Sequence, residues 1–313
     1  MEELGNRIKQ YGWRLMEVES LQGMHAGQIL KIRVLDKENR PIKLIYKVFA
    51  MDRNNEIDIY KKIFPYIKTL TPIIKIWATE PEAVLMTDLN DPLKKSFEEL
   101  SLSLKEDVLT KIIYELVELH ALPNLDFLNR GVPLHTSSTE WYEWCIGQFE
   151  KLSTLIWYET DWVEAIRHSF QTCGMNRYEI KGPVVLTHGD PHLDNIFIKE
   201  DGTISFIDWE WAALGSPLRD SSILLQDLYD SELVNFVKDI QHALLQERGF
   251  YQDEKIYIED FNHLYIEHSY MMLAWEIGKF IEGYISEETI KNIIKFKIVQ
   301  IQNSSKELQK LLK

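Results

Sequence analysis

The sequence predicts an α+β protein of two lobes, a small β-rich N-lobe and a larger, mostly helical C-lobe. Its 313 residues, 45% of them hydrophobic, are enough for two domains or for one domain built as two lobes. Segments rich in β-branched and aromatic residues fill the first part of the chain, and long amphipathic helical patterns follow. We therefore expect the N-lobe over residues 1–90 and the C-lobe over residues 91–313.

The N-lobe begins with a helical stretch and continues mainly as strands. LKIRVL and KLIYKVFA flank a polar turn from Asp36 to Pro41 and predict a β-hairpin. NNEIDIYKKIF has apolar side chains at helical intervals, so we expect a helix that begins at Asn54 or Asn55 and stops at Pro65. IIKIWAT and EAVLMTDL predict two further strands. Together these elements form a small sheet with one inserted helix.

The C-lobe is helical except for one block. Apolar residues recur along one helix face from Val108 to Leu119. Further along the chain, VVLT, HGDPHLD and NIFIK predict a strand, a loop and a strand, and ISFID predicts another strand after the Asp201-Gly202 turn. Polar residues gather at the ends of these apolar strands, which makes the block the candidate functional region.

The charge of the chain narrows the class of partner. The formal net charge is -14, and residues 1–90 carry 14 Lys and Arg against 12 Asp and Glu. The remaining residues therefore carry 21 basic and 37 acidic side chains. Such an acidic C-lobe repels phosphate backbones, so we expect no nucleic-acid partner. It favours a cationic small molecule, with improved solubility as the alternative explanation.

The sequence also predicts a cytoplasmic protein that does not insert into a membrane. It has only two cysteines, too few for a disulfide framework, and its start, MEELGNRIKQYG, lacks the apolar core of a signal peptide. No run approaches the ~18 consecutive apolar residues that a spanning helix needs.

Three polar side chains follow the predicted strands of the central block. Asp190 and Asn195 come after VVLT, and Asp208 closes ISFID. Mg²⁺ prefers oxygen ligands and keeps waters and substrate phosphates in its shell, so Asn195 and Asp208 are candidate metal ligands. Asp190 can then accept a hydrogen bond from a substrate hydroxyl and take its proton, which makes it the candidate catalytic base. A polar turn capped by Asx residues is the alternative.

HGDPHLDN followed by ISFIDWE resembles the signature of the aminoglycoside phosphotransferase and choline kinase family, whose members are relatives of the protein kinases. The resemblance covers nearly the whole chain, because other elements occur in the order that the family shows. It implies a two-lobed protein-kinase-like fold. It also implies an enzyme that uses Mg²⁺ with ATP or GTP as the phosphate donor.

Two N-lobe residues match the family's phosphate-binding pair. Lys47 stands in the otherwise apolar strand IYKVF, where a buried ammonium is costly unless it is paired. It resembles the kinase strand lysine that contacts the α- and β-phosphates, and Glu56 matches the acid that pairs with it. Asp58 is the alternative partner for Lys47, and an exposed role for Glu56 remains open.

Two backbone segments complete the implied nucleotide site. GMHAG, from Gly23 to Gly27, resembles the phosphate-covering loop, although it departs from GxGxxG and a plain hairpin turn is the alternative. VLMTDL resembles the hinge, whose backbone from Thr87 to Leu89 would meet the adenine edge. An ordinary connection between lobes is the alternative for this segment.

The family's helix-ending histidine and its bracing acid are matched by His120 and Asp220, for which the resemblance implies structural roles. The sequence does not identify a partner for Arg219. Trp141, Trp144 and Glu210 are further candidates for contact with the acceptor.

The function implied by this resemblance is that of a small-molecule kinase, a phosphotransferase with an alcohol group as acceptor. An aminoglycoside-like aminated sugar is the first choice of acceptor. Choline, ethanolamine or another metabolite alcohol is the alternative, because a fold does not fix a substrate. A non-catalytic nucleotide-binding protein is less favoured, because the candidate base, metal ligands and lysine are all intact.

Overall fold

The computed structural model describes residues 2–21, 27–49, 55–79 and 81–311. The chain divides into two densely packed units, each of which is described by itself. Unit 1 comprises residues 1–100, 129–132 and 193–212, and unit 2 comprises residues 101–128, 133–192 and 213–313. The predicted α+β class is confirmed, since unit 1 contains an antiparallel sheet and unit 2 is mostly helical.

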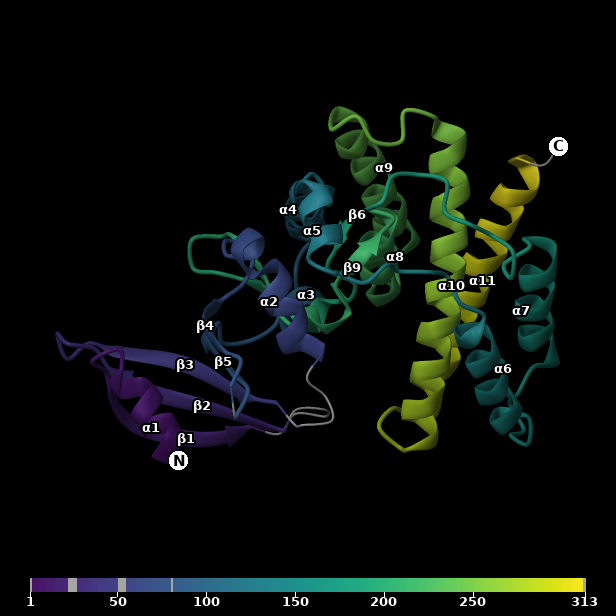
Figure 1. Cartoon of the computed structure of the whole chain (residues 1–313). Helices are drawn as coiled ribbons and strands as arrows, with labels where there is room; N and C mark the ends of the chain where they lie inside the picture. The colour runs from purple at the N-terminus through teal and green to yellow at the C-terminus, as the bar shows by residue number, and fades with distance from the viewer. Residues whose placement is uncertain (1, 22–26, 50–54, 80, 312–313) are drawn as a thin grey trace. The chain divides into compact units, whose positions relative to one another are not determined.

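Unit 1 is built on a five-stranded antiparallel sheet with the strand order β1-β2-β3-β5-β4 (Figure 1). Its strands are β1 Arg14–Leu21, β2 Gln28–Leu35, β3 Pro41–Val48, β4 Ile73–Trp77 and β5 Ala83–Thr87. Alternate side chains of β2 and β3 are buried, because they share one core with the apolar side of helix α1, Glu2–Lys9. The predicted hairpin and the later pair of strands are both present.

Helix α2 runs from Asn55 to Ile67, so its predicted start is confirmed and its predicted stop at Pro65 is wrong. Pro65 lacks an amide hydrogen and removes one hydrogen bond from the helix. The Ile67 side chain beyond it is fully buried. Its burial continues the apolar face of α2 and offsets the lost bond.

Unit 1 also contains a two-stranded antiparallel hairpin and several short helices. These elements are α3 Lys94–Phe97, the 3-10 helix η1 Leu193–Asn195, β7 Ile196–Ile198, β8 Ile204–Phe206 and the 3-10 helix η2 Trp209–Trp211. Backbone hydrogen bonds from Leu93 N–H to the Ile196 carbonyl and from Phe206 N–H to the Leu70 carbonyl tie this hairpin to the first hundred residues. Packing groups residues 193–212 with the sheet, so the division into units does not follow one cut in the sequence. The predicted lobe boundary after residue 90 stays a prediction.

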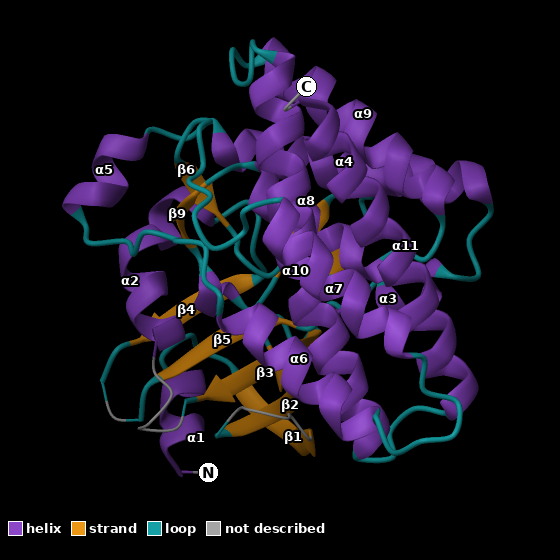
Figure 2. Cartoon of the chain, turned by 90° about the vertical axis from the view of Figure 1, so that its right-hand side faces the viewer, coloured by secondary structure: helices purple, strands orange, loops and turns teal. Residues whose placement is uncertain are grey.

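Unit 2 is mostly helical, as the purple ribbons of Figure 2 show. Its helices are α4 Leu102–His120, α5 Asn124–Asn129 (whose last residue falls in unit 1), α6 Glu140–Leu152, α7 Thr160–Thr172, α8 Leu218–Leu224, η3 Leu225–Asp227, α9 Ser231–Glu247, α10 Glu254–Ile281 and α11 Glu287–Leu311. One apolar core is shared by α6, α7, α10 and α11. Strands β6, Val185–Thr187, and β9, Ala213–Gly215, pair antiparallel, and β6 packs against α4.

Across the ranges that the structure describes, we find no helix with the length and apolar character needed to cross a membrane.

Candidate active site

Lys47 is the centre of an ion-paired cluster in unit 1. Its ammonium Nζ lies 2.5 Å from Glu56 Oε2 and 3.2 Å from Asp208 Oδ1. Strand β3 supplies Lys47, the first turn of α2 supplies Glu56, and Asp208 follows β8. The predicted partner is thus present, whereas the alternative, Asp58, is exposed and pairs with Lys61. A partly buried cation shared by two carboxylates is fixed in position without a ligand.

The Glu56 carboxylate is held from both sides. Its Oε1 accepts a hydrogen bond of 2.7 Å from the Tyr60 hydroxyl, and that hydroxyl oxygen in turn accepts a hydrogen bond from the Trp209 backbone amide. Glu56 is 4% exposed, and burial raises its pKa to about 7, against the opposing influence of Lys47. The charges of Glu56 and Asp208 raise the pKa of Lys47 despite its burial. Lys47 is therefore a cation at neutral pH.

Glu56→Gln is expected to change how the stability of the metal-free protein depends on pH. The Glu56 pKa is about 7 in the folded protein and 4.5 as its ordinary value, so the folded state binds the proton more tightly and loses stability as pH rises through this window. The stability of Glu56→Gln relative to wild type should therefore rise by roughly 3 kcal/mol across it. Urea unfolding from about pH 4 to pH 8 measures the difference. A difference independent of pH would contradict this assignment.

Asn195 and Asp208 lie at the same end of the β7–β8 hairpin. Ile196 pairs with Phe206, and the Ile207 amide donates a hydrogen bond of 3.0 Å to the Asn195 carbonyl, one step further along. Asp208 follows directly, with a φ of 64° in the left-handed region that Asn and Asp adopt more readily than most residues. Its side chain is 37% exposed and remains accessible to a ligand. An amide and a carboxylate therefore gather at this hairpin end.

For the segments expected to contact the nucleotide base and phosphates, the structure gives the backbone position and the exposure of each described residue. Thr87 is the last residue of β5, and its amide donates to the Pro72 carbonyl within the sheet. Leu89 follows two residues later and is half-buried. Gly27 is exposed directly before β2, whereas Gly23 lies outside the described residues. Nucleotide contacts by these four residues remain predictions.

In unit 2, the loop after β6 is fixed through Asp220. The fully buried carboxylate of Asp220 accepts hydrogen bonds from the backbone amides of His188, at 2.9 Å, and Gly189, at 2.8 Å. His120, the last residue of α4, donates its Nε2 hydrogen to the same group at 2.9 Å. These bonds hold the pKa of Asp220 below its usual value although burial opposes them. His120 and Asp220 thus have the structural roles that the sequence predicts.

Asp190 follows this fixed segment. Its amide donates to His188 Nδ1 at 3.2 Å, and its Oδ2 lies 3.4 Å from His192 Nε2. The side chain is 29% exposed, so a solute can reach the carboxylate. Gly189, with a φ of 88°, allows the turn that directly precedes it.

The sequence also matches a known family. A model of the phosphotransferase enzyme family matches residues 77–253, more than half of the chain. The chain belongs to the phosphotransferase enzyme family. No curated protein matches the sequence.

Solved structures of phosphotransferases have the same fold at low sequence identity. A putative aminoglycoside phosphotransferase from Ralstonia eutropha has a TM-score of 0.61 at 14% identity, over 99% of this chain and 98% of its own. The GDP and kanamycin complex of APH(2")-IIia has a TM-score of 0.57 at 15% identity, over 97% and 98%. Choline kinase LicA from Streptococcus pneumoniae has a TM-score of 0.53 at 15% identity, over 99% and 98%. The predicted kinase-like fold is confirmed, and family membership confirms the predicted enzyme class, a phosphotransferase.

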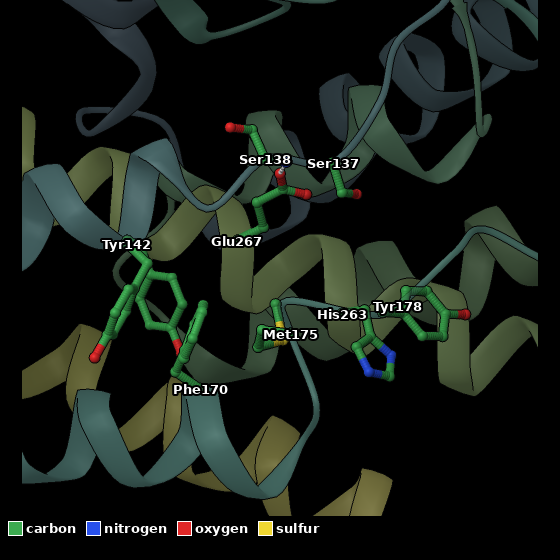
Figure 3. Close-up of a pocket in the computed structure, with 9 residues that line it drawn as sticks. Ser137, Ser138, Tyr142, Phe170, Met175, Tyr178, His263 and Glu267 are labelled. Carbon is green, nitrogen blue, oxygen red and sulfur yellow. Dashed lines mark hydrogen bonds between the residues drawn. The ribbon is translucent and has the colours of Figure 1, made fainter.

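This member of the phosphotransferase family also has a small cavity within unit 2. The cavity has a volume of about 10 Å³ and is lined by aromatic side chains, Ser137, Ser138 and Glu267 (Figure 3). Glu267 is buried and accepts a hydrogen bond of 2.9 Å from the Ser138 amide. Burial raises the pKa of Glu267, against the hydrogen bonds from Ser138 and Ser137 and the charge of Arg219.

Sequence reasoning missed several groups that hold the site of this phosphotransferase. Tyr60 occupies an apolar position in the helical pattern of α2, yet its hydroxyl links Glu56 to the Trp209 amide of η2. Glu267 was not singled out, because a carboxylate in a long helix is usually exposed. Its place in a strongly apolar stretch of α10 was the available signal.

Proposed function

We propose that this phosphotransferase transfers the γ-phosphate of ATP or GTP to a hydroxyl group of a small molecule. The observation that carries the proposal is the Lys47 ammonium, held at once by Glu56 and Asp208. This arrangement suits a lysine that contacts nucleotide phosphates beside a metal-binding carboxylate. A nucleotide-binding protein without turnover is disfavoured, because the candidate base Asp190 is also present, partly exposed and on a fixed loop.

Mg²⁺ is the metal that the family resemblance implies, and the residues present fit it. Among the described residues, no three His, Cys, Asp or Glu side chains form a metal-binding group. Mg²⁺ commonly takes only one or two protein oxygen ligands and completes its shell with water and phosphate. Asn195 and Asp208 would supply those ligands. The bound ion would neutralise negative charge on the phosphates.

The chain's own residues supply the remaining steps. Asp190 accepts the proton of the acceptor hydroxyl while that oxygen forms its bond to the γ-phosphorus. The bond from the γ-phosphorus to the bridging oxygen breaks, and its electron pair leaves with the nucleoside diphosphate. Lys47 binds the α- and β-phosphates, while Asp220 and His120 keep the loop of Asp190 in place.

For the acceptor, an aminoglycoside-like aminated sugar is the first proposal, with choline, ethanolamine or a related amino alcohol as the alternative. The charge of -14 supports a cationic acceptor. The cavity beside Glu267 supports an amine in particular, since aromatic walls and a buried carboxylate attract an ammonium group. Its volume of about 10 Å³ has room for one water-sized group. A single amino group would therefore enter.

Glu267→Gln is expected to weaken the binding of amine acceptors selectively. We expect their KM to rise by about tenfold, while the KM of a neutral alcohol changes less than about twofold, because the variant removes only the negative charge. Steady-state kinetics with ethanolamine and with ethylene glycol makes the comparison. Equal changes in KM for both acceptors would show that Glu267 does not bind the amino group of the acceptor.

The proposed activity is tested by a screen with Mg²⁺ and either ATP or GTP. The acceptors are aminoglycosides, choline, ethanolamine, sugars and neutral alcohols, and nucleoside diphosphate release is followed with each. Stimulation by one acceptor class would support transfer and identify that class. Nucleotide binding without stimulation by any acceptor would favour the non-catalytic alternative. A cytoplasmic location, without nucleic-acid or membrane partners, remains a prediction.

A further inference from the structure

Arg219 is a buried cation next to the candidate catalytic loop. It is the second residue of α8, directly before Asp220, and is only 5% exposed. Its Nη1 donates a hydrogen bond of 2.9 Å to Thr187 Oγ1. Burying a guanidinium group is costly, and a neutral hydroxyl does not balance its charge. Negative groups nearby must therefore stabilise it.

Three carboxylates provide that stabilisation. Burial lowers the pKa of Arg219, and Asp220, Asp190 and Glu267 oppose this in decreasing order. Asp220 already accepts three hydrogen bonds, from His120 and from two loop amides. Glu267 likewise accepts a bond from the Ser138 amide. Asp190, by contrast, is the partly exposed carboxylate of the three and the one expected to react.

Arg219 and Asp220 together hold the segment that leads to Asp190. Arg219 holds Thr187 through its hydroxyl, and Thr187 Oγ1 also donates to the Ala213 carbonyl of β9 at 2.9 Å. Asp220 holds the next two residues, His188 and Gly189, through their amides. Adjacent residues of one short helix therefore fix three consecutive residues before the candidate base.

We propose that Arg219 is a positioning residue for phosphoryl transfer, which fixes the segment before Asp190 through Thr187 and balances the negative charge of the carboxylates around it. This inference rests on the proposed function of Asp190 as the base. Arg219 and its hydrogen-bond partner Thr187 lie 32 residues apart in the sequence. A cation at this place attracts the Asp190 and Asp220 carboxylates alike.

The test compares Arg219→Met, Arg219→Lys and Thr187→Val with wild type. We expect Arg219→Met to lower kcat by about 100-fold, and Thr187→Val by about tenfold, with the Kd of Mg²⁺-nucleotide within about twofold in both. Arg219→Lys loses the planar fork but keeps the positive charge. Its kcat should therefore be at least about tenfold higher than that of Arg219→Met. Calorimetry gives the Kd values, and thermal unfolding shows that each variant is folded.

Three results would overturn the inference. One is a folded Arg219→Met variant with kcat within about twofold of wild type, and another is an equal loss of kcat in the Lys and Met variants. The third is a loss of nucleotide affinity in place of kcat. If Arg219→Met does not fold, the Lys and Thr187→Val variants still decide the matter. Wild-type protein that transfers no phosphate would instead refute the proposed function, and this inference with it.

Discussion

Asp190→Asn is expected to lower kcat by about 10³-fold, within the range that loss of a general base produces. An amide has nearly the shape of the carboxylate but cannot take the proton of the acceptor hydroxyl. The loop should stay folded, because Asp220 and His120 hold it through the amides of His188 and Gly189. The affinity for Mg²⁺-nucleotide should therefore remain within about twofold of wild type.

Steady-state kinetics and calorimetry on Asp190→Asn separate these two quantities. Asp161→Asn is the matched control, since it makes the same chemical change at an exposed position in the first turn of α7. It should leave kcat unaltered. An Asp190→Asn variant with wild-type kcat would show that another group takes the proton.

Asp208→Asn is expected to weaken nucleotide binding itself. Asparagine tolerates the left-handed backbone at this position, where alanine would add strain, so the variant changes charge with little change in fold. It removes a carboxylate expected to bind Mg²⁺ and one of the two anions paired with Lys47. The Kd of Mg²⁺-nucleotide should rise by at least roughly tenfold, the lower end of what losing a metal-site partner costs.

Calorimetric titrations with and without Mg²⁺ measure this effect. In wild type, added Mg²⁺ should tighten nucleotide binding, and in Asp208→Asn most of that gain should vanish. Asp190→Asn serves as the comparison, because its defect is expected in kcat alone. An unchanged dependence on Mg²⁺ in Asp208→Asn would exclude it as a metal ligand.

Local patterns predicted much of the fold. β-branched and aromatic residues marked the strands of the N-terminal sheet, and alternate side chains of β2 and β3 are buried. Pro65 predicted an early end for α2, but the helix continues to Ile67, because the burial of Ile67 outweighs one lost hydrogen bond. The place of the β7–β8 hairpin in unit 1 had no local signal, because it depends on backbone hydrogen bonds with Leu93 and Leu70, which are distant in sequence.

The candidate site was predictable where a charged residue stands in an apolar segment. A lysine in an apolar strand requires an anion, and Glu56 meets that need at 2.5 Å. The family resemblance implied structural roles for His120 and Asp220, but their hydrogen bond joins residues a hundred positions apart and was not predicted. The partners of Arg219 could not be predicted, because Thr187 and Glu267 are brought near it only by the packing of α8 in unit 2.

The most direct test of the central claim is to follow the terminal phosphate itself. Wild type and Asp190→Asn are incubated with Mg²⁺, nucleotide labelled in its γ-phosphate and the acceptor identified by the screen. Mass spectrometry then quantifies the label in the acceptor. The proposed function predicts one labelled acceptor for each nucleoside diphosphate formed by wild type, and almost none with Asp190→Asn. Label released only as inorganic phosphate, or equal transfer by the variant, would contradict it.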